Sequence, residues 1–277
     1  MPNFGACAGE VQPQTLNMAI TRVLKTNWLT RKPASEAESL TAILASIVAV
    51  MTWMFWNDVF HANEWMSASG VQVFEKHEYW RLWTSLFAHA DPGHLVSNAI
   101  LFIPLSFFLT GYFGPFFFPL FGFFVGGLVN IVALKTMTPQ SSIIGISGLV
   151  YWMGSAWLTL YLLIGSRESF RRRAGKALFI AAALFAPQTF EPNVSYVAHF
   201  FGFVFGVPSA FAYYFFNRER IKSAEVYELV IDDDDDDDAH QIGQTSQALI
   251  YAVRDFDSIS GPDQRDRATD DHRPTYH

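Results

Sequence analysis

The chain has 277 residues, of which 51% are hydrophobic and only 16% are charged. Because about a quarter of the residues in a typical soluble domain carry charge, this composition argues against a disordered or nucleic-acid-binding protein. The formal net charge of −7 is uneven, since residues 223–277 hold 15 acidic and 4 basic residues and residues 1–222 hold 11 and 15. An apolar, mildly basic body therefore precedes an acidic tail.

Cysteine usage is minimal, because Cys7 is the only cysteine. One cysteine excludes an internal disulfide framework and a thiolate metal cluster. The first 38 residues contain no apolar core after a basic start, so we expect no cleavable signal peptide. We predict no cofactor and no metal ion.

Long stretches lack Asp, Glu, Lys and Arg, namely 39–57, 92–134, 136–166, 177–190 and 192–217. A membrane-spanning helix needs roughly 20 apolar residues, and glycine and proline at Gly111–Pro115 divide the second stretch into two. We therefore predict an all-α, polytopic membrane protein with a bundle of six transmembrane helices, near 39–58, 93–112, 116–134, 146–164, 174–190 and 196–216. The fifth is the weakest, because its uncharged run has only 14 residues.

Basic residues predict the orientation. Twelve Lys and Arg lie in residues 1–38, in the loop after the fourth span and at the start of the tail, whereas the opposite loops hold only Lys76, Arg81 and Lys135. Because basic loops are retained in the cytoplasm, we place both termini there, in what we expect to be a bacterial inner membrane. The predicted parts are a cytoplasmic segment (1–38), a membrane domain (39–217) and an acidic tail (218–277).

Two segments lie outside the spans. The tail includes seven consecutive aspartates, Asp232–Asp238, and has no apolar period, so we predict that it is disordered. The first external loop, about residues 60–92, contains Trp65, Tyr79, Trp80 and Trp83. Amphipathic rings favour the membrane interface, so this loop is predicted to be a lid or rim.

The spans contain almost no charged residues, which argues against a coupled transporter. The polar residues that remain are neutral. His94 and Asn98 begin the second span, Ser147 begins the fourth, and His199 lies about one turn into the sixth. Because even-numbered spans all enter from outside, these four residues are predicted to lie at a similar, shallow depth.

Small residues predict how the fourth and sixth spans meet. Gly145 and Gly148 flank Ser147, and Gly202 and Gly206 share a helical face with His199. Such glycines permit close helix packing in lipid, so Ser147 is expected within hydrogen-bond reach of His199. This arrangement is typical of a serine nucleophile with a histidine general base.

These motifs together resemble the rhomboid intramembrane serine proteases. The resemblance covers about residues 40–216 and rests on their order and spacing; the motif residues are Trp80-Arg81, His94, Asn98, Gly145, Ser147, Gly148, Ala198-His199, Gly202 and Gly206. It implies cleavage of a peptide bond in or beside a transmembrane segment of another protein. The expected partners are therefore such membrane-protein substrates and the lipid bilayer, not nucleic acid.

The resemblance also implies roles for single residues. Ser147 would be the nucleophile and His199 its base, in a dyad without a carboxylate. His94, Asn98 and the Ser147 backbone N–H would form the oxyanion hole. Tyr151 matches a position whose ring packs on the catalytic histidine, and His89 matches a histidine with a supporting role.

Two alternatives remain open at this point. One is a catalytically silent rhomboid-like protein that binds client transmembrane segments. The other is a metal or haem protein, since imidazole is a common ligand; the histidines available to it are His61, His77, His89, His94 and His199. No His-Glu-x-x-His motif supports the second alternative.

Overall fold

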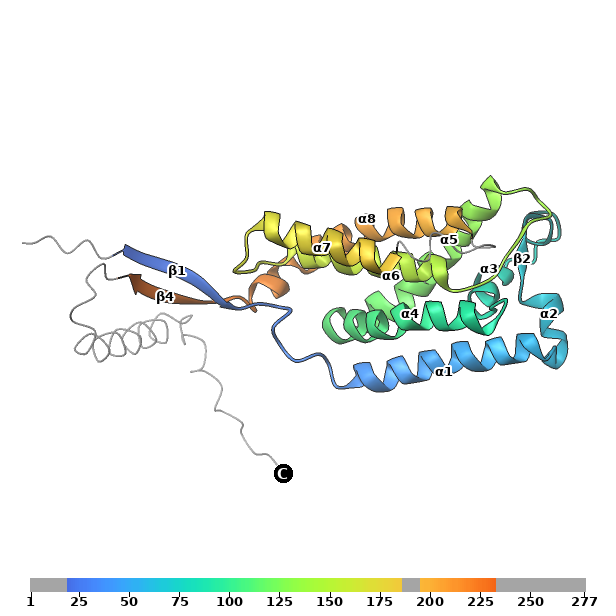
Figure 1. The fold of residues 1–277 in the computed structure, drawn as a ribbon, viewed down its shortest axis with the longest axis horizontal. Coiled ribbons are helices and arrows are strands. Elements are labelled where there is room, and N and C mark those ends of the chain that lie inside the picture. The colour runs from blue at the N-terminus through green and yellow to red at the C-terminus, as the bar shows by residue number, and fades with distance from the viewer. Residues whose placement is uncertain (1–18, 186–194, 233–277) are drawn as a thin grey trace, which may run out of the picture. The chain divides into compact units, whose positions relative to one another are not determined.

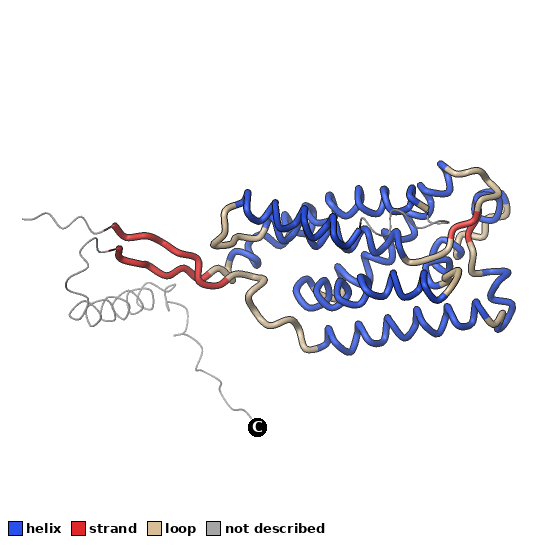
Figure 2. The backbone as a smooth tube through the Cα atoms, viewed as in Figure 1, coloured by secondary structure: helices blue, strands red, loops and turns tan. Residues whose placement is uncertain are grey.

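A computed structural model describes residues 19–185 and 195–232. Long helices dominate these residues, as Figures 1 and 2 show. They are α1 (Glu36–Trp56), α4 (Pro92–Phe113), α5 (Gly122–Thr136), α6 (Ser147–Leu163), α7 (Phe170–Phe185) and α8 (Tyr196–Lys222). The prediction of an all-α membrane protein is therefore confirmed.

Four of the described helical segments are long and apolar enough to cross a membrane: Glu36–Trp56, Pro92–Phe113, Phe116–Thr136 and Tyr196–Lys222. The third consists of α5 and the π-helical turn Phe116–Phe121 before it. At 17 residues, α6 is at the lower limit of about 17 for a transmembrane helix, and α7 has 16 residues. Each predicted span corresponds to a described helix, with residues 186–190 of the fifth outside the described part.

The break inside the long uncharged stretch occurs where glycine and proline predict it. Helix α4 ends at Phe113, and Gly114 follows with a φ of 87°, a left-handed conformation that glycine adopts without steric cost. Pro115 then begins the next helical turn. Two antiparallel helices thus replace the single span that the charge pattern alone would permit.

The loop between α1 and α4 folds into short elements. They are the 3-10 helices Val59–His61 and Ser85–Phe87, the π-helical turn Val71–Glu75, α2 (Ala62–Trp65), β2 (Ala68–Ser69) and α3 (Arg81–Thr84). Strand β2 pairs antiparallel with β3 (Ser142–Ile143), with Ala68 opposite Ile143. The first loop is therefore joined directly to the segment that leads into α6.

The predicted boundary of the tail is wrong. Helix α8 continues to Lys222, and β4 (Val226–Asp232) forms a two-stranded sheet with β1 (Ala19–Thr26). The tail was judged by its charge, but residues 226–231 are mostly β-branched, aromatic and apolar, which favours a strand. The rest of the acidic tail, from residue 233, lies outside the described residues.

One compact unit, Arg22–Glu228, contains all the helices described above. The described residues of the second unit are 19–21 and 229–232, the outer parts of β1 and β4. The core of the larger unit is centred on α6, whose residues from Ser147 to Ala156 are all buried.

Candidate active site

Helix α4 begins with a cap that places His94 in its first turn. The Asp91 side chain accepts a hydrogen bond from the His94 backbone N–H at 2.9 Å, and Pro92 occupies the first helical position, where its missing N–H costs nothing. Asp91 was not singled out from the sequence, although an Asp-Pro pair before an apolar run is a recognisable helix start.

One turn further along α4, Asn98 lies on the same face as His94. The Asn98 side chain is 2% exposed, and its Nδ2 donates a hydrogen bond to the His94 carbonyl at 3.0 Å. This bond fixes the amide rotamer but uses only one of its two N–H groups. The other N–H can therefore be directed at a substrate atom.

Gly145 joins the α4 histidine to the segment that precedes α6. Its φ of 108° is strained for any side chain, and a Cβ placed on it would lie 2.8 Å from Cε1 of His94. Its backbone N–H donates to the Ser85 carbonyl at 2.8 Å. Glycine is thus needed twice here, for the backbone conformation and for the direct contact with the imidazole.

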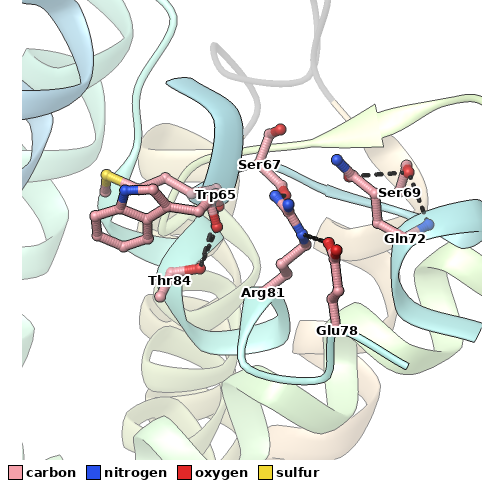
Figure 3. A network of polar contacts seen from close by, with 8 residues as sticks. Trp65, Ser67, Ser69, Gln72, Glu78, Arg81 and Thr84 are labelled. Atoms are coloured by element: carbon pink, nitrogen blue, oxygen red, sulfur yellow. Dashed lines mark hydrogen bonds and ion pairs between the residues drawn. The ribbon is translucent and has the colours of Figure 1, made fainter. Parts of the chain in front are cut away.

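A polar network in the first loop supports that segment, as Figure 3 shows. Arg81 is buried, donates from Nη1 to the Ser67 carbonyl at 2.9 Å and pairs with the Glu78 carboxylate. Ser67 directly precedes β2, which pairs with β3 two residues before Gly145. Arg81 therefore positions the approach to α6 through the β2–β3 pair, a structural role consistent with its place in the Trp80-Arg81 motif.

Asn130 in α5 makes a second tie between the first loop and the membrane helices. Its Nδ2 donates to the Leu82 carbonyl at 2.8 Å and to Ser85 Oγ at 3.2 Å. Asn130 was not singled out from the sequence, although a buried asparagine in an uncharged span is costly unless it is bonded. The polarity of Asn130 in an uncharged span was the feature of the sequence that could have identified it.

Helix α8 carries His199, which is 4% exposed, in its first turn. The Tyr151 ring of α6 is stacked on the His199 imidazole, with a centroid distance of 4.1 Å and an interplanar angle of 12°. Ser147 lies one turn before Tyr151 at the start of α6. The predicted packing of Tyr151 on this histidine is present.

Glycines allow α6 and α8 to approach this closely. A Cβ on Gly202 would lie 2.1 Å from the Gly148 carbonyl oxygen, and one on Gly206 would lie 1.8 Å from Ser155 Oγ. A Cβ on Gly148 would lie 3.3 Å from the Ala198 carbonyl oxygen, beside His199. The close packing that the small-residue pattern predicted is therefore found in the structure.

The expected hydrogen bond between Ser147 and His199 is not formed. Both ring nitrogens of His199 are buried, and neither has a hydrogen-bond partner among the described residues. Helices α6 and α8 thus pack closely without this bond. Such bonds are often long in substrate-free enzymes and tighten when the reacting group binds.

His89 lies at the edge of this cluster, in the turn before α4. Its Nδ1 is 2.9 Å from Thr52 Oγ1 of α1, and its ring meets the His94 ring edge to face at 5.1 Å. Thr52 Oγ1 donates its hydrogen to the Phe87 carbonyl at 2.7 Å, so Nδ1 of His89 carries a proton as the donor to Thr52. Burial, reinforced by His94, lowers the pKa of His89 to about 3, which keeps the ring neutral.

Two further histidines among the described residues, His61 and His77, do not join the cluster. His61 and His77 are exposed in the first loop, where His61 lies 3.8 Å from an Asp58 oxygen and His77 bonds Tyr79. Across residues 19–185 and 195–232, no three His, Cys, Asp or Glu side chains are grouped so that they could hold a metal ion.

A groove of about 380 Å³ opens between α1 and α4 on the apolar surface. Small residues of α1, including Ala45 and Ala49, form one wall, and Asn98 and Ile146 lie on the other side. Ile146 directly precedes Ser147, so the groove reaches the residue next to the candidate nucleophile.

The Rhomboid domain family model matches residues 76–217. This range begins in the first loop before α3 and ends within α8, so it includes His89, His94, Asn98, Ser147 and His199. No protein among the curated proteins matches the chain.

Proposed function

The chain belongs to the rhomboid family of intramembrane proteins, and from this premise we propose that it is a serine endopeptidase that cleaves transmembrane segments of other membrane proteins. Ser147 is the nucleophile and His199 the general base. The observation that supports the proposal is the close packing of α6 and α8, which stacks Tyr151, one turn after Ser147, on the buried His199. His94 of α4 contacts Gly145, two residues before Ser147.

The proposed first step is attack of Ser147 Oγ on the carbonyl carbon of the scissile peptide bond. A ring nitrogen of His199 takes the hydroxyl proton and then delivers it to the leaving amine. No carboxylate bonds His199 within the described residues. The orientation of the imidazole is therefore set by Tyr151, which stacks on it. Water then hydrolyses the acyl-enzyme. In this step His199 takes a proton from the attacking water and delivers it to Ser147 Oγ, which is the leaving group.

The negative charge that develops on the carbonyl oxygen has three candidate donors. Among the residues that the structure describes, no side chain caps the start of α6, so the Ser147 N–H is available at a helix N-terminus, where the dipole favours an anion. The second N–H of Asn98 and the His94 ring complete the set. Donors of this kind contribute about 2.7–4 kcal/mol each in soluble serine proteases.

A fluorophosphonate probe tests the nucleophile without knowledge of the substrate. Detergent-purified protein should be labelled, and both Ser147→Ala and His199→Ala should abolish labelling. Ser155→Ala is the matched control, since Ser155 is also buried in α6, two turns further along, and should leave labelling in place. Labelling that survives Ser147→Ala in folded protein would refute the assignment.

The absence of a Ser147–His199 hydrogen bond favours a second candidate, a catalytically silent protein that binds client segments. The same experiment separates the two. A folded wild-type protein that is not labelled, yet retains a client transmembrane segment in a pull-down, would support the silent candidate.

We also propose that both termini face the cytoplasm. The basic residues Arg31, Arg167 and Arg220 lie at the helix ends opposite to Ser147, and such residues are retained on the cytoplasmic side. A cysteine introduced at Phe60, in the first loop, should react with an impermeant maleimide from outside. Reaction only after the membrane is broken would reverse the assignment.

A further inference from the structure

The end of α4 opposite to the candidate active site is covered by the segment that precedes α1. The Trp28 indole N–H donates to the Tyr112 carbonyl at 2.9 Å, and Ala34 N–H donates to the Gly111 carbonyl at 2.9 Å. These bonds satisfy carbonyls that would otherwise be unpaired at a helix C-terminus. They also fix Trp28, which is 3% exposed, at the end of a membrane-spanning helix.

Two arginines from distant parts of the chain lie on this one indole ring. The Arg31 guanidinium is 3.2 Å from the Trp28 ring centroid, and the Arg220 guanidinium, from the last turn of α8, is 5.3 Å from it. Partial burial and the positive charge of Arg220 lower the pKa of Arg31 below its ordinary value. The packing around Trp28 therefore holds two positive charges close together despite their mutual repulsion.

Within the described part of the chain, no carboxylate neutralises this pair. Among residues 19–185 and 195–232, the acidic partners of cations are Glu228, Asp58, Glu78 and Glu168, and none of them pairs with Arg31 or Arg220. Arg31 uses Nη2 to bond the Tyr112 carbonyl at 2.8 Å, which leaves most of its five N–H donors for another acceptor. The Arg220 guanidinium makes no hydrogen bond of this kind within the same residues.

The surroundings of the pair are those of a membrane interface. Tyr112 and Trp157 lie 5.8 Å apart, and Tyr213 packs on Phe113 at 5.3 Å while its hydroxyl bonds the Phe113 carbonyl. Amphipathic aromatic rings at the ends of membrane helices mark the level of the lipid headgroups. The acceptor that reaches this level most readily is a headgroup phosphate.

We propose that Arg31 and Arg220 form a binding site for the phosphate of an anionic phospholipid, with Trp28 as its floor. Guanidinium groups suit this role because their planar N–H pairs match phosphate oxygens in a bidentate manner. The bound headgroup would relieve the repulsion between the two arginines. It would thereby hold the N-terminal segment, α4 and α8 together at one face of the membrane. This proposal is independent of proteolysis.

The test measures lipid binding to the full-length protein in detergent by native mass spectrometry. Short-chain phosphatidylglycerol should bind, and short-chain phosphatidylcholine should bind more weakly because its headgroup has no net charge. A basic residue near an anionic surface contributes a factor of about five in affinity, so Arg31→Gln with Arg220→Gln should weaken phosphatidylglycerol binding about thirtyfold.

The matched control is Arg171→Gln with Arg172→Gln, which removes two exposed charges from the start of α7. This variant should bind phosphatidylglycerol as the wild type does. Equal weakening in both double variants would overturn the site, because it would indicate attraction by overall charge. Because Arg31 also caps α4, Arg220→Gln alone provides a variant that keeps this cap, and it should lose about fivefold.

Competition identifies the source of the phosphate. Inorganic phosphate at the lipid's concentration should leave phosphatidylglycerol bound, because the acyl chains add apolar contact. Displacement by inorganic phosphate at that concentration would overturn the lipid assignment in favour of a free anion. Undiminished phosphatidylglycerol binding by the folded double variant would refute the proposal altogether.

Discussion

Tyr151 and His199 lie face to face at 4.1 Å, so the aromatic ring of one helix sets the plane of the imidazole of another. Neither imidazole nitrogen is bonded within the described residues, so this contact is the main restraint on the ring that the structure reveals. The orientation of a general base without a carboxylate partner thus depends on packing.

A first prediction concerns this stack. Tyr151→Ala should lower kcat about a hundredfold, because a general base displaced by about 1 Å loses its alignment with the nucleophile. Tyr151→Phe preserves the ring and should retain most of the turnover. Cleavage of a transmembrane substrate in detergent would measure both. Equal losses in the two variants would show that the hydroxyl, and not the ring, is what matters.

A second prediction concerns Asn98. Asn98→Ala should lower kcat by about 10²–10³ with little change in KM, because an oxyanion donor acts in the transition state and not in substrate binding. Steady-state kinetics at several substrate concentrations separates the two constants, and thermal unfolding checks that the variant is folded. A change confined to KM would assign Asn98 to substrate binding, which its position in the groove between α1 and α4 would also permit.

A third prediction concerns the contact between α6 and α8. Gly202→Ala should destabilise the protein by about 3 kcal/mol, because its Cβ would overlap the Gly148 carbonyl and the helices would have to separate. Gly206→Ala should act similarly through Ser155 and Trp152. Gly175→Ala in α7 is the control, since no atom lies within 4 Å of its Cβ position. This control should be neutral or stabilising by up to about 1 kcal/mol, as measured by thermal unfolding.

A fourth prediction concerns pH. The folded protein holds the pKa of His89 at about 3, whereas the unfolded chain has the ordinary value of 6.5, so between these values only the unfolded state takes up the proton. The stability due to His89 is complete above pH 6.5 and is lost as the pH falls towards 3, by about 1.4 kcal/mol per pH unit for one proton. Unfolding at pH 7.5, 6 and 5 would show this loss.

The variant His89→Gln isolates that contribution. It should be less stable than the wild type at pH 7.5, because the bond to Thr52 changes, but its stability should fall less steeply below pH 6.5. His77→Gln, at an exposed position, should keep the wild-type pH dependence. An unchanged slope in His89→Gln would assign the acid sensitivity to other groups.

A fifth prediction concerns the tail. Truncation after Asp232 should leave activity and thermal stability unchanged, because β4 is retained. Truncation after Lys222 should lower the melting temperature, since β1 loses its partner strand, Lys25 loses its ion pair with Glu228 and Arg22 loses its contact with the Tyr227 ring. Equal melting temperatures for the two truncations would show that the sheet contributes nothing to stability.

Local chemistry in the sequence was sufficient for much of the architecture. Uncharged stretches of about 20 residues predicted the helices, because a helix of that length crosses the bilayer and satisfies its backbone polar groups within the segment. Gly114 and Pro115 marked the turn after α4, and the spacing of Gly202 and Gly206 marked the face that meets α6. Each of these features depends on backbone geometry within a few neighbouring residues.

Only the tertiary structure decided which residues distant in the chain contact each other. The residues that neighbour Ser85, Asn130 and Thr52 in the sequence do not predict the hydrogen bonds that each makes near the candidate site. The pairing of β1 with β4 was missed for the same reason, because a strand's partner can lie 200 residues away. The sequence determined which side chains were available, and the packing of α6 on α8 determined that Tyr151, one turn after Ser147, stacks on His199.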